Sequence, residues 1–592
     1  MKSFFKTMVA SFIGAILAGI VVMLLFFATA VGVVSSASSE EVPELDTNSI
    51  LHLKLNRRIV DRESKNPFEG FDYINMQPQK TLGLNNILEN IEKAAEDDNI
   101  KGVFLDLSSL NAGIATVEEI RNALANFRQS GKFIVSYANN YDQKTYYLAS
   151  VADEVYVTPT GEIAFIGLSA QIMFFKNALE KFGVEPVIIR HGKFKSAVEP
   201  FMLDKMSEAN REQTKTYMGS IWGTMLNDIS VSRNISTEKL NDIADNLLMK
   251  NEQAAVDLGF IDGVKYRDEV MDLLKEKVAA EKVKDIEFVS LGKYDKVPKK
   301  KKEGEKGLAK DKIAIIYASG NIVTGKSGEG TMGSETVAAA LRKAREDKKV
   351  KAIVLRINSP GGSALASEII WRETVLAKKE KPLIVSMGDL AASGGYYIAC
   401  AADTIVASPS TLTGSIGVFG LLFNVKKLMN EKIGISIDKV NTNKYADIGS
   451  AYKQMSEEEK SFIQNMIEDV YGTFIEHVAE GRGMTTAEVD SIGQGRVWSG
   501  ANALDIGLVD VIGGLDKAVE IAAEKAGLNR YRIKPLPIQK EPFEQFLEDL
   551  KGDAVSIFSN EQTEFSMVYD YYKTLSNMQG VQARVPFEIQ IK

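Results

Sequence analysis

The chain has 592 residues, of which 45% are hydrophobic and 25% charged, and it carries a formal net charge of -8. This composition is typical of a globular protein with room for several domains. The acidic excess argues against nucleic acid as the main partner, because a phosphate-binding surface normally needs a basic excess. With one cysteine and three scattered histidines, the sequence predicts no disulfide framework, no zinc or other metal site, and no cofactor.

The first forty residues contain a long uncharged segment. It runs from Val9 to Val34, is preceded by Lys2 and Lys6, and is followed by several acidic residues. At 1.5 Å per residue this length exceeds the roughly 30 Å hydrocarbon core of a bilayer. The alternative is a cleaved signal peptide, whose apolar region is usually only about 7–15 residues long. We therefore expect an uncleaved single-pass anchor, with the N-terminus in the cytoplasm and the remaining chain across the membrane.

The chain contains two copies of one domain. The stretch I-K-G-V-F-L-D-L from Ile100 matches V-K-A-I-V-L-R-I from Val350, and further matches at the same offset continue over some sixty residues. Short β-branched runs alternate with helical patterns in each copy, which predicts parallel strands joined by crossover helices, an α/β fold. We place the cytoplasmic N-terminus at 1–8, the anchor at 9–34, the first copy at 47–295, a Lys-rich linker at 296–312, the second copy at 313–538 and a helical tail at 539–592.

Differences between the copies indicate where chemistry could lie. The second copy has D-L-A-A-S-G-G-Y-Y, with Ser393 before Gly394, where the first copy has Gln143 and Lys144. A lone Ser-Gly-Gly is more often a turn than a nucleophile. A fold that needed this turn would need it in both copies, so the difference favours a nucleophilic role for Ser393.

A glycine pair follows an earlier strand of the second copy. Gly361 and Gly362 belong to N-S-P-G-G-S, and the first copy has S-S-L-N-A-G at this place. Glycines let backbone N–H groups point into a cleft without interference from Cβ atoms, as an oxyanion hole requires.

A serine nucleophile needs a base, and the scarcity of histidine makes lysine the candidate. A lysine can accept a proton at neutral pH only if its pKa is lowered by several units. Lys195 lies between apolar and small residues in R-H-G-K-F-K-S-A-V-E-P-F, and the second copy has Ala446 at the equivalent place. Most lysines in such a run are solvated, so the pattern alone leaves the identity of the base open.

Taken together, the anchor, the tandem copies and the motifs K-S-A-V-E-P-F, S-P-G-G-S, D-L-A-A-S-G-G-Y-Y and T-G-S-I-G-V-F-G closely resemble the signal peptide peptidase A (protease IV) family in its long bacterial form. The resemblance runs from the anchor to about residue 525. It implies two tandem crotonase-like, ClpP-like domains and a serine endopeptidase that degrades remnant signal peptides. It also implies a bacterial inner-membrane protein with its catalytic domains on the periplasmic side, and a homo-oligomer, as a tetramer.

The resemblance assigns roles residue by residue. Ser393 would be the nucleophile and Lys195 the general base. Ser415, in T-G-S-I-G, would orient the lysine amine, and Phe165 replaces it in the first copy. The backbone N–H groups around Gly361, Gly362 and Gly394 would form the oxyanion hole.

Two other classes of function stay open. One is another acyl-transfer or CoA-binding enzyme on the same fold, since a fold does not fix a function. The other is a non-catalytic membrane scaffold, which a serine-directed acylating probe would not label. We also expect Asp389 to cap the helix that opens near Ser393.

Overall fold

The computed structural model describes residues 43–64, 71–72, 77–78, 80–299, 309–328, 330–539 and 581–584, with part of 4–22. The described residues between Phe4 and Val22 are helical, and the predicted anchor from residue 23 onward lies outside the described residues. No helix in the described part of the chain is long and apolar enough to span a membrane.

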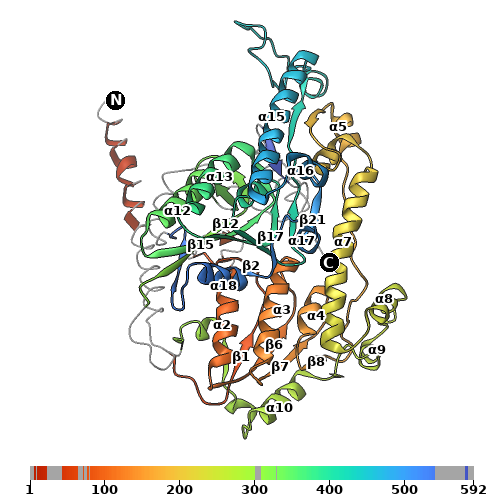
Figure 1. Cartoon of the computed structure of the whole chain (residues 1–592), viewed down its shortest axis with the longest axis vertical. Helices are drawn as coiled ribbons and strands as arrows, with labels where there is room; N and C mark the ends of the chain where they lie inside the picture. Colours follow the sequence, from red (N-terminus) through yellow and green to blue (C-terminus); the bar gives the residue numbers. More distant parts are fainter. Residues whose placement is uncertain are drawn as a thin grey trace.

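The two copies share one order of helices and strands, at an almost constant offset (Figure 1). Helix α2 (Leu84–Glu96) corresponds to α12 (Ser334–Glu346), and α3 (Ile114–Arg128) corresponds to α13 (Ala364–Lys378). The tandem organisation predicted from the sequence is therefore confirmed. Further corresponding pairs are α4 (Gln143–Ala149) with α14 (Gly394–Ala399), α7 (Glu208–Arg233) with α15 (Glu457–Arg482), and α10 (Arg267–Lys277) with α18 (Leu515–Lys525).

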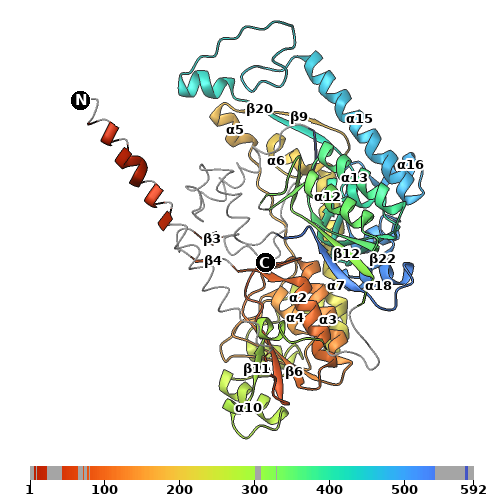
Figure 2. The same ribbon diagram turned by 90° about the vertical axis from the view of Figure 1, so that its left-hand side faces the viewer.

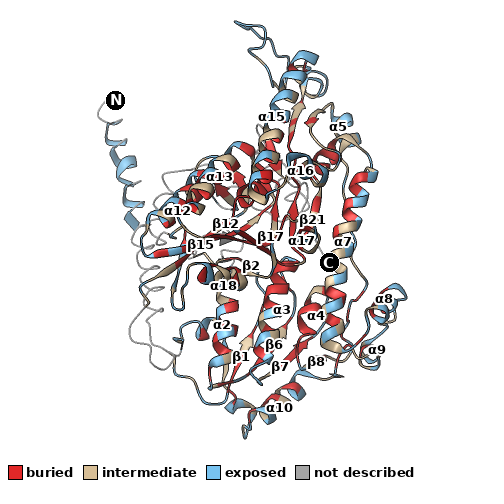
Figure 3. Cartoon of the chain, in the orientation of Figure 1, coloured by how far each residue is buried: buried red, intermediate tan, exposed pale blue. Residues whose placement is uncertain are grey.

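Each copy is built on its own sheet. The first sheet has the order β10-β8-β7-β6-β1-β11 and is parallel throughout. The second has the order β21-β19-β17-β15-β12-β23, and in addition β18 pairs with β17 and β22 pairs with β18. Among these pairings only that of β21 with β19 is antiparallel. Their central strands are buried on both faces (Figure 3), which explains their unbroken Val, Ile and Leu runs. The strands are β1 (Ser49–Leu53), β6 (Ile100–Leu107), β7 (Phe133–Ala138), β8 (Glu154–Val157), β10 (Gly263–Val264), β11 (Phe288–Ser290), β12 (Lys312–Ser319), β15 (Val350–Ser359), β17 (Leu383–Ala392), β18 (Thr404–Ala407), β19 (Leu412–Gly414), β21 (Val497–Ser499), β22 (Val511–Ile512) and β23 (Arg532–Leu536).

A third, mixed sheet joins the copies. Its order is β14-β13-β16-β24-β20-β9. Strand β9 of the first copy runs antiparallel to β20 of the second over their whole lengths (Figure 2). The chain that follows β9 is thereby brought to the second copy. The strands are β9 (Glu185–Arg190), β13 (Asn321–Val323), β14 (Thr331–Gly333), β16 (Gly361–Ser363), β20 (Phe419–Asn424) and β24 (Gln582–Arg584).

The structure describes the two ends of the linker and a short part of the tail. The predicted amphipathic helices of the tail lie in residues 540–580, outside the described residues, as does the centre of the Lys-rich linker. The described part of the distal tail is not helical, because Gln582–Arg584 forms strand β24. This strand finds partners on both sides, in β16 and β20. The prediction of a helical tail is therefore wrong for these residues.

A buried ion-pair cluster also joins the copies. Arg356, on the central strand of the second copy, is completely buried. Its Nε atom lies 2.7 Å from a carboxylate oxygen of Asp61, and its Nη2 atom lies 2.6 Å from one of Glu119, both from the first copy. Glu119 also accepts a hydrogen bond from the backbone N–H of Leu515. Such a cluster fixes how the copies dock, since each charge needs its partners.

Asp389 caps a helix of the first copy rather than the helix beside Ser393. Its carboxylate accepts hydrogen bonds from the backbone N–H of Thr116, at 2.9 Å, and from the Thr116 hydroxyl, at 2.6 Å. Thr116 lies in the first turn of α3, whose N–H groups have no partner within the helix. The end of β17 lies against this helix, so Asp389 reaches α3 across the interface between copies.

We predict that Glu119→Ala destabilises the protein strongly. The change leaves the buried Arg356 guanidinium with one of its two carboxylates, and the loss of one partner of a buried pair typically costs about 3–5 kcal/mol. The urea midpoint of unfolding, followed by circular dichroism, should fall clearly. Asp242→Ala, which removes an exposed pair with Lys239, is the matched control and should leave the midpoint unchanged. Equal midpoints for the two variants would contradict the role of the cluster.

Candidate active site

Ser393 occupies a strained corner between β17 and α14. Its backbone dihedral angles are φ 57° and ψ -115°, a region that residues with a Cβ atom rarely adopt. Its N–H donates to the carbonyl of Gly414, at the end of β19, at 2.8 Å. A serine on a sharp turn between a strand and a helix presents its hydroxyl at the edge of a sheet, the geometry of a nucleophile elbow.

The side chain of Lys195 meets Ser393 at this corner. Lys195 is only 1% exposed, and its Nζ atom lies 2.8 Å from Ser393 Oγ. The same nitrogen lies 3.0 Å from the Ser415 hydroxyl oxygen and 3.0 Å from the Ser415 carbonyl oxygen. The structure thus brings together three predicted site residues that are separated by up to 220 positions in the chain.

Burial lowers the pKa of Lys195 well below its ordinary value of 10.5. A neutral amine has two N–H donors and one lone pair, and three oxygen atoms surround it. The Ser415 carbonyl can only accept, and the Ser415 hydroxyl can accept the second N–H. The lone pair is then available to accept the hydrogen bond of the Ser393 hydroxyl. The arrangement therefore suits a neutral lysine that acts as a base toward Ser393.

Residues that the sequence did not single out hold the backbone around Lys195. Arg190 Nη1 donates to the Lys195 carbonyl at 3.0 Å. The Gln213 amide donates to Phe194 O and Ser196 Oγ, and its oxygen accepts from the N–H of Val497 in the second copy. Gln213 thus ties the lysine loop to β21.

Gly495 allows the close approach of the two segments. A Cβ atom added there would lie 2.6 Å from Lys195 Cα, and its φ of 83° also favours glycine. No local pattern in the sequence marks Arg190, Gln213 or Gly495, since their contacts exist only after distant segments meet.

The three predicted oxyanion glycines lie beside Ser393, but they are not equivalent. The N–H of Gly361 donates to Ser359 Oγ at 3.1 Å, within its own loop. Gly394 directly follows Ser393 at the start of α14, and Gly362 lies on strand β16, between β13 and β24. A Cβ atom added at Gly361 would lie 2.8 Å from the Gly394 nitrogen, so these glycine segments pack against each other.

Side chains occupy the equivalent corner of the first copy. Lys144, the counterpart of Gly394, donates to the Ala112 carbonyl at 2.8 Å. Gln143, the counterpart of Ser393, accepts hydrogen bonds from the N–H groups of Ile166 and Gly167. Phe165, the counterpart of Ser415, is buried against aromatic rings of the first core. The first copy therefore lacks the strained corner seen at Ser393 and fills the equivalent place with its own side chains.

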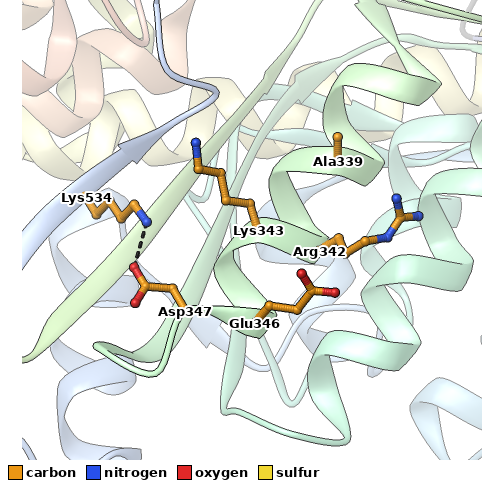
Figure 4. A pocket seen from close by; sticks show the side chains of 6 residues that line it. All are labelled: Ala339, Arg342, Lys343, Glu346, Asp347 and Lys534. Carbon is orange, nitrogen blue, oxygen red and sulfur yellow. Dashed lines mark hydrogen bonds and ion pairs between the residues drawn. The ribbon is translucent and has the colours of Figure 1, made fainter.

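The other features of the described residues do not compete with this site. No group of three His, Cys, Asp or Glu side chains in that part of the chain is placed to hold a metal ion. A surface hollow on α12 and β23 is lined by charged side chains, among which Lys534 pairs with Asp347 (Figure 4). None of its lining residues belongs to the corner at Ser393.

Comparison with known families agrees with the tandem architecture. The family described as Peptidase family S49 matches residues 126–281 and 376–529, once in each copy. The chain belongs to peptidase family S49. The family described as Clp protease also matches residues 303–411, in keeping with a Clp-protease-like α/β fold.

Several known proteins are similar to this S49 peptidase over most of its length. The chloroplastic serine protease SPPA of Arabidopsis thaliana is 37% identical over 85% of this chain and 74% of its own. Protease 4 of Salmonella typhi is 38% identical, over 79% of this chain and 76% of its own. Protease 4 of Haemophilus influenzae is 39% identical, over 73% of this chain and 71% of its own. The S49 peptidase is therefore a serine protease, which acts on peptide substrates.

We predict that kcat/KM of this S49 peptidase rises with pH along an ascending limb set by Lys195. The amine can accept a proton only when it is neutral, and burial places its pKa well below 10.5. Lys195→Ala should lower kcat/KM by at least about 1000-fold, because it removes the base of the pair. Ser415→Ala should shift the limb to a different pH, since it removes a contact of the amine. The pH profile of ester hydrolysis measures both effects, and an unmoved limb in Ser415→Ala would contradict this role.

We also predict that Lys195→Met stabilises the fold while abolishing activity. The folded pKa of Lys195 lies below its unfolded value, so the unfolded state binds more protons and folding is penalised below pH 10.5. Methionine removes this penalty, so the variant should unfold at a higher temperature at pH 7, with a gain that shrinks as pH approaches 10.5. Lys193→Met, an exposed position two residues away, is the control and should show no such gain. A lower unfolding temperature for Lys195→Met would contradict the burial of an uncharged amine.

Proposed function

We propose that this S49 peptidase is a membrane-anchored endopeptidase with a Ser393/Lys195 dyad, and that it degrades signal peptides left after secretion. The observation that carries the proposal is the 2.8 Å separation of Lys195 Nζ and Ser393 Oγ in a buried site. A lysine with a pKa lowered by burial is what a serine needs when no histidine is near. The substrate class is transferred from the family resemblance.

The chemical steps follow from the positions of the side chains. The Ser393 hydroxyl attacks a peptide carbonyl and passes its proton to Lys195. Lys195 gives that proton to the leaving amine as the C–N bond breaks, and then takes a proton from the water that hydrolyses the acyl-enzyme. Ser415 acts as a positioning residue, because it holds the lysine amine in line with Ser393.

We assign the oxyanion hole to the backbone N–H groups of Gly362 and Gly394. Gly394 follows the nucleophile, as in other strand–turn–helix hydrolases, and Gly362 lies on the strand beside it. Gly361, whose N–H is engaged by Ser359, would shape the loop between them. This refines the set of three glycines that the sequence suggested.

The anchor, the location and the assembly belong to the same proposal. We assign residues 9–34 to a single-pass anchor in a bacterial inner membrane, with both copies outside the cytoplasm. We keep the division into copies at 47–295 and 313–538. Exposed apolar side chains on the segment after the π-helical turn Leu428–Ile433 support a homo-oligomer, in which this segment would be covered; they are Ile435, Ile437, Val440, Tyr445, Ile448 and Tyr452.

We predict that the detergent-solubilised full chain cleaves a synthetic signal peptide within its apolar region. The apolar side chain of Ile322, which packs against Gly394 beside the nucleophile, favours an extended apolar peptide over a charged one. A peptide of equal length with lysines in place of its central leucines should be cleaved at least about tenfold more slowly, since burial of an unpaired charge in an apolar subsite is unfavourable. Mass spectrometry of the fragments reads out both reactions. Ser393→Ala should leave both peptides intact, and fragments from that variant would disprove the proposed nucleophile.

A further inference from the structure

One short loop of the second copy contacts both Lys195 and Ser415. This bridging loop comprises residues 493–496 and lies directly before β21. Its Gly495 packs against the backbone of Lys195. The carbonyl of its Arg496 accepts a hydrogen bond from the N–H of Ser415 at 2.6 Å. The position of the bridging loop therefore sets where the lysine amine and the serine that contacts it meet.

Tyr471, on α15, holds the bridging loop in place. Its side chain is buried. The Tyr471 hydroxyl donates a hydrogen bond to Asp490 Oδ1 at 2.6 Å and accepts one from the backbone N–H of Gln494 at 3.2 Å. The Gln494 carbonyl in turn accepts a hydrogen bond from the N–H of Phe194 at 2.9 Å. Tyr471 is thus connected, through the bridging loop, to the residue that precedes Lys195.

His191 binds the lysine loop, residues 191–196, directly to the same tyrosine. Its imidazole ring stacks on the ring of Tyr471, with the ring centroids 3.8 Å apart and 22° between the planes. Its Nδ1 atom lies 2.5 Å from a carboxylate oxygen of Glu468, which is also on α15. A carboxylate oxygen accepts hydrogen bonds, so Nδ1 carries the hydrogen. Two separate contacts therefore hold the lysine loop on α15, four residues before the base.

His477 makes the same two kinds of contact elsewhere on α15. Its ring stacks on Trp371, with the centroids 3.4 Å apart, and its Nε2 atom lies 3.1 Å from a carboxylate oxygen of Glu368. Both of these partners lie on α13 and not on the lysine loop. The chain thus offers a second stacked and carboxylate-bound histidine with which the role of His191 can be compared.

We propose that His191 is a positioning residue for the base, which holds the lysine loop on Tyr471 and Glu468 and thereby keeps the Lys195 amine against Ser393. The inference rests on the proposed dyad. Proton transfer between the two side chains depends on the geometry of their hydrogen bond. A residue that fixes the loop therefore acts on the reaction through Lys195.

The environment of the amine gives this role a measurable signature. The side chains within hydrogen-bond distance of the amine, Ser393 and Ser415, carry no charge, and burial is what lowers the pKa of Lys195. Loss of the His191 contacts would loosen the lysine loop and admit water to the amine. The pKa of Lys195 would then rise toward its ordinary value of 10.5.

The test follows kcat/KM against pH for hydrolysis of a short apolar peptide ester by the detergent-solubilised full chain. His191→Ala should move the ascending limb to higher pH by about one unit. At pH values below the limb, kcat/KM should fall about tenfold, because the neutral fraction of an amine changes tenfold for each unit of its pKa. His191→Phe, which keeps a ring on Tyr471, should move the limb less. His477→Ala is the matched control and should leave the limb at its wild-type position.

The unfolding temperature is measured on the same samples, so that a moved limb is compared between folded proteins. A folded His191→Ala with the wild-type limb would overturn the inference and leave the dyad intact. An equal movement in His477→Ala would overturn it too, by assigning the effect to α15 as a whole. If His191→Ala does not fold, Glu468→Ala, at an exposed position, should move the limb in the same direction, and an unmoved limb would overturn the inference. Wild-type turnover by Lys195→Ala would overturn the dyad and the inference together.

Discussion

A lysine amine whose pKa is lowered by burial is the constraint on which the candidate site depends. Its pKa is lowered because burial excludes water from the amine, and residues of both copies surround it. The first copy supplies the lysine loop and the second supplies both serines that contact its amine. Each copy alone lacks part of the candidate site, so the side chains of the site meet only where the copies dock.

The interface between the two copies is built from interactions that fix the orientation of one copy relative to the other. The pairing of β9 with β20 delivers the loop that carries Lys195, and Gln213 ties this loop to β21. The pairs of Arg356 with Asp61 and Glu119 allow little displacement, because any shift would leave a buried charge without a partner. The close contact of 2.8 Å between Lys195 Nζ and Ser393 Oγ requires this degree of fixation, since proton transfer of the kind proposed depends on hydrogen-bond geometry.

The sequence could reveal the repeat and most of the site because duplication provides an internal comparison. Ser393, Ser415 and Lys195 differ from Gln143, Phe165 and Ala446, and each difference marks a position where one copy has changed its role. Arg190, Gln213 and Gly495 could not be found in this way, since their contacts depend on how distant loops meet. Strand β24 was also beyond prediction, because three residues in an apparently helical tail become a strand only when two other strands lie ready to pair with them.

The place between β16 and β20, which β24 occupies, connects the fold to the chemistry. The backbone groups of β16 and β20 that face this place need a partner, and an extended strand satisfies them whatever its side chains are. Recognition through the main chain suits a protease that must accept many sequences, with selectivity left to a few small or apolar subsites.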